Sequence, residues 1–251
     1  MTRSGGLTMN KSAIITGASR GIGEGIARYL AAQGYHLGLF ARGEAALADV
    51  KASIEAEHPD IKVHIYPTDV SDLGAVTGAV ADFNDQLGRV DVLVNNAGIA
   101  RIGTSDVTPE DLQALLDINI KGVYNLTHMV APIMKAQGSG YIINMSSRAA
   151  KIAMPPLGAY ALTKYAVNGF NEAIFTELAP YNIKCTAICP SVIETEMTKD
   201  FDFPNDEKIQ VSDIVTTVDY LINLGPNALI KEVVVDCQRV VKAIKSPIKR
   251  D

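Results

Sequence analysis

The most constraining feature of this sequence is a regular alternation of short apolar runs with longer stretches of helical spacing. The runs at residues 13–16, 36–41, 63–66 and 90–94 are apolar along nearly their whole length. Strands of that kind are typical of a sheet that is covered by helices on both faces, and such sheets are parallel. We therefore expect an α/β fold built on a doubly wound parallel sheet.

The second half of the chain continues the same alternation. Thr108 followed by Pro109 has the pattern of a helix start, and the helix is expected to run to about Lys135. A strand at 141–145, a helix that carries Tyr160, a strand at 183–188, a helix capped near Ser212 and a last strand at 232–236 follow. This gives about seven strands flanked by helices.

Nothing in the sequence indicates a second folding unit, because it contains no internal repeat or low-complexity linker. We expect a single domain over residues 11–240, a flexible N-terminal extension at 1–10 and a C-terminal tail at 241–251.

Composition narrows the function classes. The chain has 251 residues, a net charge of -5 and a pI near 5.4, so it offers no basic face for a nucleic acid. No apolar run reaches about 18 residues, and residues 1–10 lack the apolar core of a signal peptide. We expect a cytoplasmic protein with no membrane partner. The three cysteines and four histidines show no ligand spacing, so no metal site is expected.

A glycine-rich turn joins the first strand to the first helix, at Gly17, Gly21 and Gly23. Glycines permit a tight turn and leave the helix N-terminus open to a pyrophosphate. The turn predicts a dinucleotide cofactor, held by Gly17, Ser19, Arg20, Gly21, Ile22 and Gly23.

The residues after the second strand indicate which dinucleotide is bound. An acidic residue there would bind a free ribose 2′-hydroxyl, but this chain has Arg42, and Arg20 lies in the glycine turn. Two guanidinium groups suit a 2′-phosphate, so we expect NADP(H) to be preferred over NAD(H). Asp69, at the end of the third strand, is placed to accept a hydrogen bond from the adenine amino group.

Tyr160 and Lys164 are four residues apart in a helical stretch, so they share one helix face. A nearby cation stabilises a phenolate and lowers its pKa, which makes a tyrosine usable as an acid and a base. The pair predicts proton transfer at Tyr160.

These motifs, together with Asn95-Asn96-Ala97-Gly98 after the fourth strand and Pro190 leading to Thr195 after the sixth, resemble the short-chain dehydrogenase/reductase family along nearly the whole chain. The resemblance implies a Rossmann-type fold and a catalytic set of Asn119, Ser147, Tyr160 and Lys164. It implies that Asn95 braces the sheet and that Asn96, Ala97 and Gly98 line the adenosine side. Pro190, Ile193 and Thr195 would then flank the nicotinamide, with Ile193 and Thr195 holding its carboxamide.

The expected activity is an NADP(H)-dependent oxidoreduction between a carbonyl, in a ketone or aldehyde, and an alcohol. Tyr160 would move the proton, Ser147 would hold the oxygen, Lys164 would lower the pKa of the tyrosine, and Asn119 would anchor a relay water. A 3-oxoacyl-carrier-protein reductase is the specific alternative, and a non-catalytic NADPH-binding sensor or scaffold is the alternative of another class.

Two features depart from the family's pattern. Pro190 is followed by serine, and the last strand ends in Val235-Asp236-Cys237-Gln238 where relatives have Val-Asp-Gly-Gly. That segment packs between subunits in relatives, so the resemblance leaves a homotetramer or a homodimer open. The segment between Thr195 and Ser212 is short and carries Met197, Phe201 and Phe203, which favours a compact ketone or aldehyde as the substrate.

Overall fold

The protein folds around one parallel sheet of seven strands in a computed structural model that describes residues 11–201 and 203–243. The strands lie in the order β3-β2-β1-β4-β5-β6-β7, so the chain winds outward from β1 in both directions. They comprise β1 (Ser12–Thr16), β2 (His36–Ala41), β3 (Val63–Pro67), β4 (Val92–Asn95), β5 (Gly140–Met145), β6 (Ile183–Pro190) and β7 (Glu232–Val235). The expected single-domain, doubly wound architecture is confirmed. The N-terminal extension at residues 1–10 and residues 244–251 of the expected tail lie outside the described residues.

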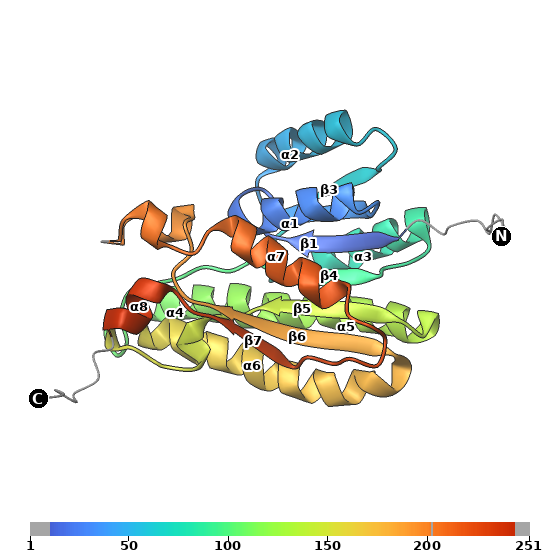
Figure 1. The fold of residues 1–251 in the computed structure, drawn as a ribbon. Coiled ribbons are helices and arrows are strands. Elements are labelled where there is room, and N and C mark those ends of the chain that lie inside the picture. The colour runs from blue at the N-terminus through green and yellow to red at the C-terminus, as the bar shows by residue number, and fades with distance from the viewer. Residues whose placement is uncertain (1–10, 202, 244–251) are drawn as a thin grey trace, which may run out of the picture.

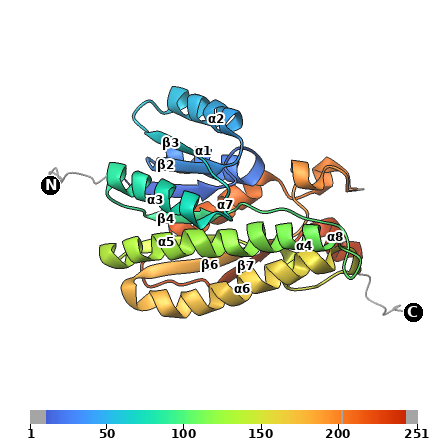
Figure 2. The ribbon, with the colours of Figure 1, turned by 180° about the vertical axis from the view of Figure 1, so that it is seen from behind.

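Two helical layers cover the sheet. Helices α1 (Gly21–Ala32), α2 (Glu44–Glu57) and α7 (Val211–Ile222) lie on the face toward the viewer in Figure 1. Helices α3 (Leu73–Leu87), α4 (Pro109–Leu116), α5 (Gly122–Gln137) and α6 (Gly158–Leu178) are in front in Figure 2, with α3, α5 and α6 packed on the opposite face. A short α8 (Gln238–Ala243) follows β7. Within the described residues, no helix is both long and apolar enough to cross a membrane.

The alternation of side chains along β1 explains the two layers. All five of its residues are buried, and Ala13 and Ile15 belong to one apolar core while Ile14 belongs to the other. A strand with both faces buried needs apolar residues at every position, which is the continuous run seen in the sequence.

A chain of buried amides crosses the centre of the sheet. Asn95 Nδ2 donates to Asn144 Oδ1 (2.9 Å), and Asn144 Nδ2 donates to Asn171 Oδ1 (3.0 Å). Asn171 Nδ2 in turn donates to the Lys231 carbonyl (3.0 Å). Buried amides need partners, and here they hold β4, β5 and α6 to the segment before β7. These contacts agree with the bracing role that the resemblance implies for Asn95.

Two expectations about helices were wrong. Thr108 does cap α4, since its Oγ1 accepts from the Asp111 amide (3.1 Å), but the long helix is interrupted by a π-helical turn at Asp117–Lys121. Such turns are wider than an α-turn and are frequent at functional sites. Helix α7 is capped by Gln210, whose amide donates to Asp213 Oδ2 (2.8 Å), and Ser212 is already inside the helix.

Candidate active site

The predicted site residues gather at the carboxyl edge of the sheet, where α8 and a segment that we call the lid also lie. The lid comprises residues 194–201 and 203–208 and is drawn in orange in Figure 1. Parallel strands all end at this edge, so residues that are far apart in sequence meet there. Ser147 follows β5 directly, and Tyr160 and Lys164 lie on the first two turns of α6. The structure therefore brings the three together.

Lys164 is buried behind Tyr160, with 5% of its surface exposed. Its Nζ donates to the Met145 carbonyl (2.8 Å) and lies 5.6 Å from the centre of the Tyr160 ring. Burial disfavours the ammonium ion and lowers the pKa of Lys164 to about 8. The lysine still carries its charge at neutral pH.

The Tyr160 phenol is held in its neutral form. Burial raises the pKa of Tyr160 to about 12, and a hydrogen bond with Ser147 opposes that rise. The expected lowering of this pKa by Lys164 stays a prediction. Ser147 Oγ is itself positioned by the Ala149 amide, from which it accepts (3.1 Å).

Asn119 lies in the π-helical turn and is completely buried. Its amide exchanges two hydrogen bonds with the backbone of Ile99: Nδ2 donates to the carbonyl and Oδ1 accepts from the N–H, both at 2.9 Å. Nδ2 also donates to Thr163 Oγ1 (3.0 Å), one residue before Lys164. The side chain thus ties the loop after β4 to α6, and the water-anchoring role of Asn119 stays a prediction.

Ser146, the residue before Ser147, is a second serine at the end of β5, and its side chain bonds to the backbone of α6. It is buried, and its Oγ donates to the Lys164 carbonyl (3.3 Å). This position agrees with the choice of Ser147 as the serine of the site.

The glycine turn has the geometry that a pyrophosphate needs. Gly17 and Gly21 have φ of 64° and 59°, and a Cβ on Gly23 would sit 2.2 Å from the Gly17 carbonyl oxygen. The first N–H groups of α1 face this turn, and the side chain of Arg20 at the N-cap does not bond to them. The turn therefore fits the phosphates of a dinucleotide.

The loop after β4 packs against the glycine turn. Thr16 Oγ1 accepts from the amides of Asn96 and Ala97 (2.9 Å each), and Asn96 Nδ2 donates to the Thr16 carbonyl (2.9 Å). A Cβ on Gly98 would lie 3.6 Å from Lys164 Nζ. The segment expected on the adenosine side thus extends from the glycine turn to the catalytic lysine.

The residues expected around the adenosine are more exposed. Arg20 and Arg42 are both exposed, and Ser19 is half-buried. Asp69 Oδ1 accepts from the Ser71 amide (2.9 Å), while the N-cap of α3 is Asp72. Asp69 is therefore not the capping acid of that helix.

The segment after β6 reaches the nicotinamide end. Pro190 and Ile193 are buried, and Ile193 is bridged to Ile209. A Cβ on Gly21 would lie 3.6 Å from Thr195 Cγ2, so Thr195 is next to the glycine turn. Ile22, in the first turn of α1, packs on the same core as Ile193.

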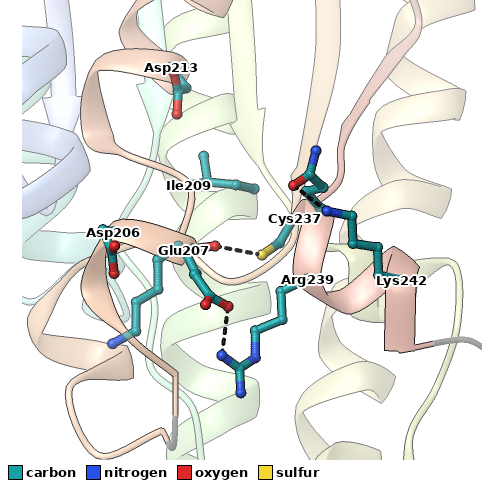
Figure 3. Close-up of a pocket in the computed structure, with 9 residues that line it drawn as sticks. Asp206, Glu207, Ile209, Asp213, Cys237, Arg239 and Lys242 are labelled. Carbon is teal, nitrogen blue, oxygen red and sulfur yellow. Dashed lines mark hydrogen bonds and ion pairs between the residues drawn. The ribbon is translucent and has the colours of Figure 1, made fainter.

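Sequence reasoning missed several neighbours of the site. Thr16 and Thr163 hold the loops described above, and nothing in a lone threonine signals such a role. Cys189, for which the sequence predicted no role at the site, lies close enough to raise the pKa values of both Tyr160 and Lys164. A cavity of about 590 Å³ lies between the lid segment and α8, and it is lined by residues 206–209, 213, 237–239 and 242 rather than by the catalytic set (Figure 3).

The sequence profile of the short chain dehydrogenase family matches residues 11–205, which is most of the chain. The chain belongs to the short-chain dehydrogenase/reductase family. It is therefore an oxidoreductase, and the resemblance seen in the sequence is confirmed.

Individual relatives agree with this assignment. Oxidoreductase UcpA of Salmonella typhimurium is 39% identical over 77% of this chain and 73% of that protein. An alcohol dehydrogenase of the archaeon Thermococcus sibiricus, solved with 5-hydroxy-NADP, is similar with a TM-score of 0.84 at 26% identity, over 95% of this chain and 99% of that one. A β-ketoacyl-ACP reductase of Bacteroides thetaiotaomicron is similar with a TM-score of 0.81 at 33% identity, over 92% of this chain and 99% of that one.

Proposed function

We propose that this oxidoreductase interconverts a ketone or aldehyde and the corresponding alcohol with NADP(H), and that Tyr160 is its acid and base. The observation that carries the proposal is the grouping of Ser147, Tyr160 and Lys164 at the carboxyl edge of the sheet, with Lys164 Nζ 5.6 Å from the centre of the Tyr160 ring and fixed by the Met145 carbonyl. A protonated phenol is the form that can donate to a carbonyl oxygen as negative charge develops there.

Each side chain has a distinct task in this chemistry. The bound nicotinamide supplies or accepts the hydride. The Ser147 hydroxyl donates a hydrogen bond to the substrate oxygen, and Tyr160 delivers the proton that completes the alcohol. Lys164 stabilises the phenolate that remains, because its positive charge is fixed near the ring.

The cofactor is NADP(H) in this proposal. Arg20 and Arg42 are exposed at the ends of the first two strands, where a 2′-phosphate would lie, and the residue after β2 is Arg42 rather than an acid. The likeness to a dehydrogenase solved with an NADP derivative agrees with this preference.

The charges around the site favour an uncharged substrate. Arg148 is paired with Asp236, Lys151 with Glu232, and Lys199 with Glu196. These three cations therefore already have carboxylate partners, so a compact neutral ketone or aldehyde fits better than an acid.

A 3-oxoacyl-carrier-protein reductase is the second candidate, favoured by the similarity to the β-ketoacyl-ACP reductase. Docking an acidic carrier requires a basic surface, and residues 165–181 contain no lysine or arginine. The structure weakens that objection, since Glu172 is paired with Lys231 and Glu177 with Lys135.

The test is NADPH oxidation with a panel of aldehydes, ketones, quinones and 3-oxoacyl thioesters. Tyr160→Phe should reduce kcat by at least about a hundredfold and leave the Kd for NADPH within about threefold, because it removes only the proton. Undiminished turnover in Tyr160→Phe would rule out the mechanism. Binding of NADPH without turnover of any compound would support the sensor or scaffold alternative.

We also propose that the protein assembles as a homotetramer or homodimer in the cytoplasm. Tyr124 on α5 and Leu162 and Tyr165 on α6 are large apolar side chains with about half of their surface exposed. Large apolar side chains that are exposed on neighbouring helices are the feature that supports an interface here. Sedimentation equilibrium measures the stoichiometry, and a monomer at micromolar concentration would contradict this part of the proposal.

A further inference from the structure

The described residues of the lid, 194–201 and 203–208, lie between Ile193 and Ile209, which are bridged to each other. The Glu194 amide donates to the Ile209 carbonyl (2.8 Å), and the Ile209 amide donates to the Val192 carbonyl (3.0 Å). These two bonds fix the base of the loop.

The part of the lid that leads into Ile209 is held by the segment Asp236–Arg239, which we call the latch (Figure 3). Arg239 forms an ion pair with Glu207 (2.6 Å between Nη1 and Oε2), and its guanidinium lies 4.9 Å from the centre of the Phe203 ring. Cys237, which is buried, donates from Sγ to the Glu207 carbonyl (3.2 Å). Three contacts from the latch thus converge on two residues of the lid.

The other end of the latch is fixed next to the catalytic serine. Asp236 forms an ion pair with Arg148, which follows Ser147 and is only 8% exposed. The latch therefore spans from the Ser147 loop to the lid, at the place where the sequence departs from the Asp-Gly-Gly of the family.

Inside the lid, Lys208 links the residues next to Glu207 to Thr198, which in turn contacts Thr195. It is buried, and its Nζ donates to the Thr198 carbonyl (2.9 Å) and to Asn205 Oδ1 (3.0 Å). The Thr198 amide donates to the Thr195 carbonyl (3.0 Å), and Thr195 lies next to Gly21. A displacement of Glu207 therefore reaches Thr195 through hydrogen-bonded neighbours.

We propose that Arg239 is a positioning residue that holds the lid in its substrate-binding conformation by clasping Glu207 and Phe203. Arg239 touches no reacting atom; it acts through the lid. The inference rests on the proposed function for its effect on substrate, but its effect on the lid is independent of that function.

The expected effect is modest because Arg239 and Glu207 are partly exposed, and an exposed ion pair or cation–π contact contributes little by itself. In Arg239→Ala, hydrogen exchange at the Glu207 and Lys208 amides should be about three- to tenfold faster. KM for the best carbonyl substrate should rise by a similar factor, with kcat and the Kd for NADPH each within about twofold of the wild type.

The experiment measures hydrogen exchange by mass spectrometry on the full chain without substrate, and steady-state kinetics on the same preparations. Lys242→Ala is the matched control: it also removes a cation from α8, but Lys242 Nζ donates to Gln238 within that helix. Arg239→Lys keeps the charge and should recover part of the protection. Glu207→Gln should reproduce the effect, and the double variant should be less than additive.

Unchanged exchange in residues 203–208 of Arg239→Ala would overturn the latch, whatever the enzyme turns over. Faster exchange with an unchanged KM would overturn the positioning role. A preparation that binds NADPH but reduces no compound would contradict the proposed function, and the exchange data would still decide whether the latch exists.

Discussion

Replacing Lys164 by methionine should stabilise the fold while it removes activity. Methionine has a similar length and no charge, so it can occupy the same buried space behind Tyr160. The stabilisation is expected because the fold holds an ammonium group with only 5% of the residue exposed, and its one hydrogen bond within the described residues is to the Met145 carbonyl.

The size of the effect follows from the pKa of Lys164. Its fall from an ordinary value of 10.5 to about 8 corresponds to a cost of about 3 kcal/mol at about 1.4 kcal/mol per pH unit. Losing the hydrogen bond to Met145 costs about 1 kcal/mol in return. Lys164→Met should therefore raise the free energy of unfolding by about 2 kcal/mol at pH 7.

The sign of the pH dependence is also determined. Below pH 8 the lysine is protonated in both the folded and the unfolded chain, so the full cost is present. Between pH 8 and 10.5 the unfolded chain binds more protons, so the wild-type protein gains stability as pH rises. The advantage of Lys164→Met is thus greatest at pH 7 and falls steadily toward pH 10.5.

The assay is urea unfolding of both proteins at pH 7.0 and pH 9.5, followed by circular dichroism. Lys208→Met is the contrast: Lys208 is equally buried, but its Nζ has two oxygen acceptors, at 2.9 and 3.0 Å, so this variant should be less stable than the wild type. The reasoning would be refuted if Lys164→Met were less stable than the wild type at pH 7. It would also be refuted if the variant's gain in the free energy of unfolding were the same at pH 7.0 and pH 9.5.

Two further substitutions test the cofactor end. Arg42→Asp should weaken NADPH binding about ten- to a hundredfold and NADH binding less than about threefold, measured by fluorescence titration; equal losses would show that Arg42 does not read the 2′-phosphate. Gly23→Ala should weaken binding of both dinucleotides more than about tenfold, because its Cβ would meet the Gly17 carbonyl oxygen at 2.2 Å. Gly78→Ala, in α3 with open space around the new Cβ, is the control and should leave both affinities unchanged.

Local signals predicted most of the fold. The apolar runs that became β1, β2, β4, β5 and β6 are almost wholly buried, while the edge strands β3 and β7 are only partly buried. Thr108 caps α4 as its position before Pro109 indicated. The π-helical turn at Asp117–Lys121 was missed because it carries no composition signal. It accompanies the contact between Asn119 and Ile99, which lie twenty residues apart.

In the candidate site, too, local sequence patterns predicted local geometry but not contacts between distant residues. The spacing of Tyr160 and Lys164 places them on one face of α6 by local geometry alone. The ion pair between Arg148 and Asp236 joins residues on different strand ends, and no local pattern predicts it. The latch was therefore visible in the sequence only as a departure from the family's Asp-Gly-Gly, and its contacts needed the fold.

The pKa of Tyr160 could not be predicted from the spacing of Tyr160 and Lys164 alone. A lysine four residues away predicts a lower pKa, since opposite charges attract, but Lys164 is buried and Tyr160 is half-buried. Burial disfavours the phenolate and the ammonium alike, so it raises the pKa of Tyr160 to about 12 and lowers that of Lys164 to about 8. A neutral phenol is the form that can give a proton to a carbonyl oxygen in the proposed reaction.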